Sequence, residues 1–105
     1  MSKYSEILSK IRDVISGIAP KSEVYLYGSR ARGNSKKQSH WDILILLNIT
    51  RITFDFEKRI IDALYDIEIE TGEVISPLIY TKKDWDNKHF FTPLYENINR
   101  EGIRL

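Results

Sequence analysis

Apolar residues recur at helical spacing near the start of the chain, which predicts an amphipathic helix. They are Ile7, Leu8, Ile11, Val14, Ile15 and Ile18. Pro20 ends this helix, because proline has no N–H to continue the hydrogen-bond ladder. The next run, Glu23–Tyr27, is rich in β-branched and aromatic residues and predicts a short strand that stops at Gly28.

The most apolar run of the chain is Trp41–Leu47, which is too short for most helices. It is apolar on both faces, so we expect a central strand that is covered on both sides. A polar and basic stretch, Ser29–Ser39, separates it from the first strand.

Helical spacing returns after the central strand and predicts a second long helix. Its apolar residues are Phe56, Ile60, Ala63, Leu64 and Ile67. Gly72 can end this helix as a C-cap. The segment Ile67–Glu70 also alternates like a strand, so the pattern leaves the end of the helix open.

The last third of the chain predicts one more strand and one more helix. Val74–Tyr80 has strand character, and Pro77 places it at a sheet edge because proline cannot donate to a ladder. Lys82–Asn87 is expected to form a surface turn or a short helix. Thr92–Arg100, with Pro93 in its first turn, predicts a closing helix.

This order of elements indicates a single α/β (α+β) domain over residues 1–105, with a small mixed sheet of three to four strands flanked by helices. The chain has no cysteine, which excludes disulfides and thiolate metal sites. No apolar run approaches the roughly 20 residues that span a bilayer, so we expect no membrane association and a cytoplasmic location. The net charge of +1 and the lack of a recognition-helix pattern give no reason to expect specific nucleic-acid binding.

Charge is unevenly distributed along the chain. The segment from Lys21 to Lys37 carries a net charge of +4, and the segment from Asp55 to Glu73 carries −5. The acidic segment is typical of a solvated helix face, and it would also suit a basic partner surface. The basic segment matters more, because it surrounds a glycine turn.

That turn is Gly28-Ser29-Arg30-Ala31-Arg32-Gly33. It leaves a strand and enters a short helical turn, which brings free backbone N–H groups to one point. Ser29 adds a hydroxyl, and Arg30 and Arg32 could neutralise phosphate oxygens. The segment therefore indicates a phosphate cradle, with a plain tight turn whose arginines face water as the alternative.

Three residues at the start of the central strand carry the second candidate site: His40-Trp41-Asp42. Side chains at i and i+2 of a strand face the same way, so we expect His40 and Asp42 on one face and Trp41 packed on the other. A carboxylate in front of an aliphatic strand either caps a turn or binds a cation.

The chain resembles the minimal nucleotidyltransferase branch of the polymerase-β-like nucleotidyltransferase superfamily. A glycine–serine pair, ten intervening residues and an acidic strand form the superfamily's signature, and Gly28–Ser29 precedes His40–Asp42 at that spacing. Ser39–Leu46 and Tyr95–Leu105 are also similar to that branch, so the resemblance covers nearly the whole chain.

The resemblance implies transfer of a nucleotidyl (AMP-like) group from a nucleoside triphosphate, ATP, to a protein or small-molecule acceptor. Gly28, Ser29, Arg30 and Arg32 would bind the nucleotide, with Ser29 and Asp42 in the catalytic set. Two strand carboxylates and a third on the next strand would hold Mg²⁺, with Mn²⁺ or another divalent ion as a substitute. The resemblance also implies a helical HEPN-family partner in a toxin–antitoxin pair.

The first acidic position of the motif is His40 in this chain. An imidazole offers one nitrogen and no negative charge, and Mg²⁺ prefers oxygen ligands. Three roles stay open for His40: a loop residue without a ligand, half of a single-ion site with Asp42 for a softer metal, or a contact to an anion.

The third carboxylate is also missing from the expected strand, since Val74, Ser76 and Leu78 share one of its faces. Glu73 at the strand entry is the nearest candidate metal ligand, with a solvated turn glutamate as the alternative. We therefore expect nucleotidyl transfer that is weak or lost. The rival hypothesis is a non-catalytic binding module that neutralises a HEPN-type partner by contact.

Overall fold

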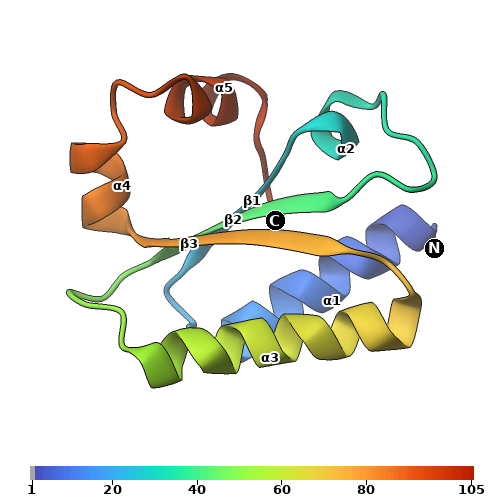
Figure 1. The fold of residues 1–105 in the computed structure, drawn as a ribbon, viewed down its shortest axis with the longest axis horizontal. Coiled ribbons are helices and arrows are strands. Elements are labelled where there is room, and N and C mark those ends of the chain that lie inside the picture. Colours follow the sequence, from blue (N-terminus) through green and yellow to red (C-terminus); the bar gives the residue numbers. More distant parts are fainter. Residues whose placement is uncertain (1) are drawn as a thin grey trace.

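Strand β2 (Trp41–Leu47) lies inside a four-stranded sheet of order β3-β2-β1-β4 (Figure 1). In this computed structural model, which describes residues 2–105, β1 (Glu23–Tyr27) pairs antiparallel with β2 and with β4 (Ile103–Arg104). β3 (Ile75–Thr81) pairs parallel with β2. The expectation that the strand with Pro77 lies at a sheet edge is confirmed.

Helices cover both faces of the sheet (Figure 1). α1 (Lys3–Ile18) and α3 (Phe54–Thr71) pack on one face, and α4 (Lys82–Lys88) and α5 (Pro93–Glu101) pack on the other. The four-residue α2 (Ser29–Arg32) follows β1 directly. Of the helices in residues 2–105, none combines the length and the apolarity needed to cross a bilayer.

Alternation along β2 divides the core into two layers. Trp41, Ile43 and Ile45 are buried with α1 and α3, whereas Leu44 and Leu46 are buried with Trp85 and Ile98 of α4 and α5. The buried residues of α1 and α3 are the ones that helical spacing predicts: Ile7, Ile11, Ile15, Ile60, Leu64 and Ile67. The central strand is therefore covered on both sides, as its sequence indicates.

Several boundaries differ from the sequence pattern. α1 begins at Lys3, where the Ser2 side chain accepts a hydrogen bond from the N–H of Ser5 and caps the helix. α3 continues to Thr71, so Ile67–Glu70 is helical despite its alternation, and Gly72 ends the helix at a φ of 75°. β3 runs one residue later than expected, and of the two outcomes predicted for Lys82–Asn87 the short helix is the one that forms, as Lys82–Lys88.

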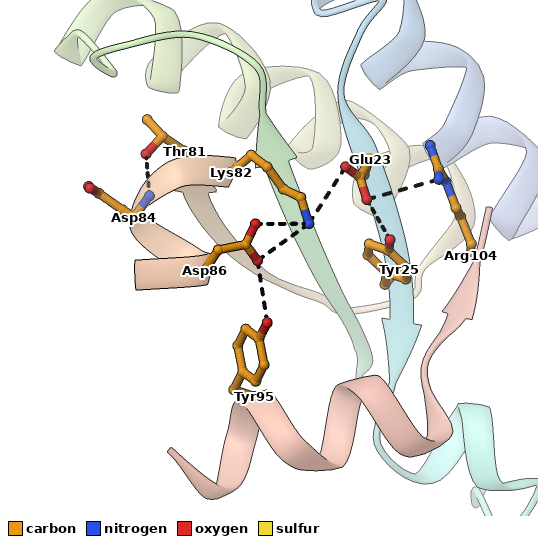
Figure 2. Close-up of polar contacts among 8 residues, drawn as sticks. All are labelled: Glu23, Tyr25, Thr81, Lys82, Asp84, Asp86, Tyr95 and Arg104. Carbon is orange, nitrogen blue, oxygen red and sulfur yellow. Dashed lines mark hydrogen bonds and ion pairs between the residues drawn. The ribbon is translucent and has the colours of Figure 1, made fainter. Parts of the chain in front are cut away.

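A polar network ties α4, α5 and β4 to β1 (Figure 2). The Glu23 carboxylate accepts a hydrogen bond from the Tyr25 hydroxyl and lies 3.8 Å from Lys82 Nζ and 3.9 Å from Arg104 Nη1. Lys82 also pairs with Asp86, which accepts a 3.4 Å hydrogen bond from the hydroxyl of Tyr95 on α5. The network fixes the end of the sheet that lies far from the turn after β1.

We expect the free energy of unfolding to fall steeply between pH 10 and 12. Burial raises the pKa of Tyr25 and of Tyr27 from 10 to about 12, with the Glu23 hydrogen bond adding to the first and the Asp42 charge to the second. Folded tyrosines then keep protons that the unfolded chain has lost, so this stability is complete below pH 10 and is lost as pH rises toward 12. Urea unfolding at pH 9, 10, 11 and 12 measures the drop, and Tyr27→Phe should make it shallower. An equal drop in Tyr27→Phe would contradict this account.

Candidate functional site

The pairing register places Tyr27, Asp42 and Ser76 in one row across three strands. Because Trp41 and Ile43 are buried on the α1–α3 face, Asp42 lies on the opposite face. The prediction that Trp41 packs away from Asp42 is confirmed. Asp42 is partly buried at the start of β2, directly beside the turn that follows β1.

The backbone of Gly28 packs against the Asp42 carboxylate. A Cβ at this position would lie 2.3 Å from Asp42 Oδ2, and the φ of 76° with ψ of −159° belongs to a region that essentially only glycine adopts. The Gly28 carbonyl accepts hydrogen bonds from the N–H groups of Ala31 and Arg32, at 3.0 and 3.1 Å. The N–H groups of Ser29 and Arg30 are therefore the first two of the helical turn, and they precede the N–H groups that bond to Gly28.

His40 lies on the same side of the sheet as this pair. Its Nδ1 is 3.1 Å from the Oγ of Ser76, and its charge acts on Asp42. The structure thus brings together three residues singled out from the sequence, Gly28, His40 and Asp42. Ser76 lies next to these residues, although the glycine–serine and His40–Asp42 motif did not predict it. The sequence indicated only that Ser76 shares a strand face with Val74 and Leu78.

Burial raises the pKa of the Asp42 carboxyl above its usual value, and the His40 and Arg32 charges pull it back in part. The ionised carboxylate is thus held where solvation is poor, with two basic side chains near it. A negative group in such a place attracts cations more strongly than one in open water.

Arg30 is engaged within the loop rather than turned toward the cradle. Its Nη2 donates a 2.8 Å hydrogen bond to the carbonyl of Ser39, and its guanidinium lies 4.3 Å from the centre of the Trp41 ring. Its Nε is buried and has no hydrogen-bond partner within the described part of the chain. Through these contacts Arg30 holds the loop that leads to His40 and Asp42, and its role as a phosphate ligand stays a prediction.

Arg32 stays at the surface and connects two elements. Its Nη1 lies 3.1 Å from Glu101 Oε1, which ties α2 to the end of α5. Its charge also lowers the pKa of the Asp42 carboxyl, less than the charge of His40 does. Of the two arginines in the turn, Arg32 is the one placed to meet an anion.

Glu73 has an ion-pair partner on α1. Its carboxylate pairs with Lys3 at 3.3 Å, and no three His, Cys, Asp or Glu side chains gather as a possible metal site anywhere in residues 2–105. The role of Glu73 as a metal ligand stays a prediction that this ion pair does not support. Ser76, not an acid, stands next to Asp42 on the neighbouring strand.

Arg30→Lys should destabilise the chain by about 1–2 kcal/mol, because lysine cannot keep the charged hydrogen bond to Ser39 and the ring contact with Trp41 together. Urea unfolding at neutral pH measures this change. Arg12→Lys is a matched control, since Arg12 is exposed and, within residues 2–105, its ion pair is with the adjacent Asp13. Equal effects of the two variants would remove the positioning role from Arg30.

Comparisons with known proteins concern the family and the fold of this chain. The nucleotidyltransferase domain family matches residues 8–98. A solved structure described as a candidate minimal nucleotidyltransferase superposes with a TM-score of 0.62 at 23% identity, over 99% of this chain and 97% of the other. At that identity the likeness concerns the fold. No protein with a curated description matches the chain.

Proposed function

Because this chain belongs to the nucleotidyltransferase domain family, we propose that it binds a nucleoside triphosphate, ATP, between the Gly28–Ser29 turn and Asp42. The observation that carries the proposal is the contact between the Gly28 backbone and the Asp42 carboxylate. The contact supports the proposal because α2 begins at Ser29, directly after Gly28, so that the first N–H groups of this helix lie near a carboxylate that could hold a cation. Phosphates and their counter-ion need this pairing of donors with an acid.

In this proposal each residue of the turn has a separate task. The N–H groups of Ser29 and Arg30 and the Ser29 hydroxyl donate to phosphate oxygens, and Arg32 neutralises phosphate charge. Gly28 allows the close approach, since any side chain there would displace Asp42. Arg30 keeps the loop in place through Ser39 and Trp41.

The residues at the site do not fit a two-metal centre. Such a centre holds two cations about 3.5–4 Å apart with bridging carboxylates, and this site offers one carboxylate, an imidazole and a hydroxyl, from Asp42, His40 and Ser76. One Mg²⁺ or Mn²⁺ ion at Asp42 would neutralise phosphate charge when bound. We therefore propose that nucleotide binding persists while transfer to a protein or small-molecule acceptor is weak or lost.

Calorimetric titration with ATP, with and without Mg²⁺ or Mn²⁺, tests the binding. We expect the ion to tighten ATP binding about tenfold, and Asp42→Asn to abolish that gain without unfolding the chain. Arg32→Ala should weaken ATP binding about tenfold. Lys21→Ala should not change it, because Lys21 is an exposed cation that precedes the first residue of β1, at the end of the strand away from Gly28. Absence of ATP binding to the unaltered chain would refute the proposal.

A second assay addresses the chemistry. With ATP labelled at the α-phosphate and either ion, we expect transfer at least about 1,000-fold slower than the roughly 10 s⁻¹ that is typical of enzymes. A normal rate that Asp42→Ala abolishes would show that the site is intact as a catalyst.

The alternative function is a binding module, an antitoxin that neutralises a HEPN-type helical protein by contact alone. It is favoured by the same residues, His40, Asp42 and Ser76, because a module that acts by contact alone does not need further carboxylates beside Asp42. Co-purification with such a partner decides between the two. Binding that survives both Asp42→Ala and ATP depletion supports the module. Binding that is lost in Asp42→Ala and on ATP depletion supports the nucleotide-dependent function.

A further inference from the structure

Helix α3 carries apolar side chains on two opposite sides. Its inner side is buried through Ile60, Leu64 and Ile67. Four more apolar residues are exposed: Phe54 by 76%, Ile61 by 40%, Tyr65 by 57% and Ile69 by 68%. They are seven, four and four residues apart, so they share one side of the helix. We call these four residues the outer stripe.

The outer stripe lies at the surface of the molecule. Figure 1 shows α3 as the outermost element on its side, below the sheet and next to α1. A surface helix normally turns charged residues to solvent on the side away from the core. A row of exposed apolar residues in that position is a mark of a protein interaction surface.

Acidic residues flank the outer stripe on both sides. Asp55, Asp62 and Asp66 each follow a stripe residue by one position and form a ridge along one side of it. One of the three, Asp62, is paired with Lys58 at 2.6 Å. Glu57 is exposed along the other side of the stripe, where the half-buried Glu68 accepts a 2.9 Å hydrogen bond from the N–H of Ile75.

These acids disfavour a second copy of the chain as the occupant. Two copies of α3 packed antiparallel about a two-fold axis would set the aspartate ridge against itself. Two copies packed parallel would set it against Glu57 and Glu68 of the other copy. Like charges meet in both arrangements, which costs binding energy.

We propose that the outer stripe binds a helix of another protein, one with an apolar stripe flanked by lysine and arginine. The apolar residues bury each other, and the cations meet the acids on both sides of the stripe. The stripe lies on the opposite face of the sheet from Asp42. The proposal is therefore independent of nucleotide binding, and either can fail without the other.

Three synthetic helical peptides test the inference against the full chain. They share the same leucine stripe and differ only in flanks of lysine and arginine, of serine, or of glutamate. Fluorescence anisotropy should show binding of the cationic peptide at least tenfold tighter than that of the serine peptide, with weakening at high salt. Equal binding of the glutamate peptide, or no binding of the cationic one, would overturn the proposal.

Variants of the chain locate the surface. Tyr65→Ser and Ile69→Ser should each weaken the cationic peptide at least tenfold, and Asp66→Lys should weaken it with the stripe left intact. Phe91→Ser is the matched control, because Phe91 is 93% exposed but lies beyond α4. Sedimentation of the chain alone should show a monomer. A dimer that Tyr65→Ser dissociates would make a second copy the occupant and overturn the inference.

Discussion

The double variant His40→Asp, Ser76→Asp is expected to bind Mn²⁺ about 100-fold more tightly than the unaltered chain and to gain nucleotidyl transfer by a similar factor or more. The reason is the row Tyr27–Asp42–Ser76, which sets position 76 next to Asp42 on the neighbouring strand. His40 Nδ1 is already 3.1 Å from Ser76 Oγ, so two new carboxylates would face each other beside the existing one.

Titration with Mn²⁺ and release of pyrophosphate from ATP measure the two gains separately. Each single variant should show a smaller gain than the pair, because a two-cation centre needs all of its bridging charge. Glu73→Asp, which keeps one acid at a position that pairs with Lys3 and adds none to the row, is the control and should change neither readout. Unchanged Mn²⁺ affinity in the double variant would show that positions 40, 42 and 76 do not converge on one ion.

Gly28→Ala is expected to lower the free energy of unfolding by about 2–3 kcal/mol and to abolish ATP binding. The backbone there has a φ of 76° and a ψ of −159°, and the added methyl would lie 2.3 Å from Asp42 Oδ2. The chain must relieve both the backbone strain and the clash, and either movement separates the turn from the carboxylate.

Gly33→Ala provides the matched comparison. Gly33 also has a positive φ, 79°, but a Cβ there would meet nothing within 4 Å. This variant should therefore lose only about 1 kcal/mol, the cost of the left-handed conformation, and should keep ATP binding. Urea unfolding and calorimetry of both variants check the contrast, and loss of binding in both would mean that the turn as a whole, rather than its contact with Asp42, matters.

Local pattern was sufficient to predict the elements and part of the site. Neighbouring side chains of a strand point to opposite faces, and this rule correctly predicted Trp41 and Asp42 on opposite faces of β2. Trp41 is buried on the face that packs against α1 and α3. Gly72 ends α3 as expected, since a left-handed residue there satisfies the last carbonyls of the helix.

Contacts between distant segments could not be predicted in the same way. The pairing of Ser76 with Asp42 depends on the register of two parallel strands, which neither strand encodes alone. Arg30 turns to Ser39 and Trp41 because the loop folds back over α2, and Glu73 turns to Lys3 because α1 passes beside it. A charged side chain in a loop shows its chemistry in the sequence, but only the fold decides its neighbour.

The two-residue strand β4 has a consequence for the whole sheet. It pairs with Tyr25 and Leu26 of β1, and Leu105 donates a 2.9 Å hydrogen bond to the carbonyl of Val24. Without these last residues, β1 would present a row of unpaired backbone groups to solvent, the usual starting point for aggregation between edge strands. Because β1 leads directly into Gly28, a short C-terminal segment shields the strand that carries the turn.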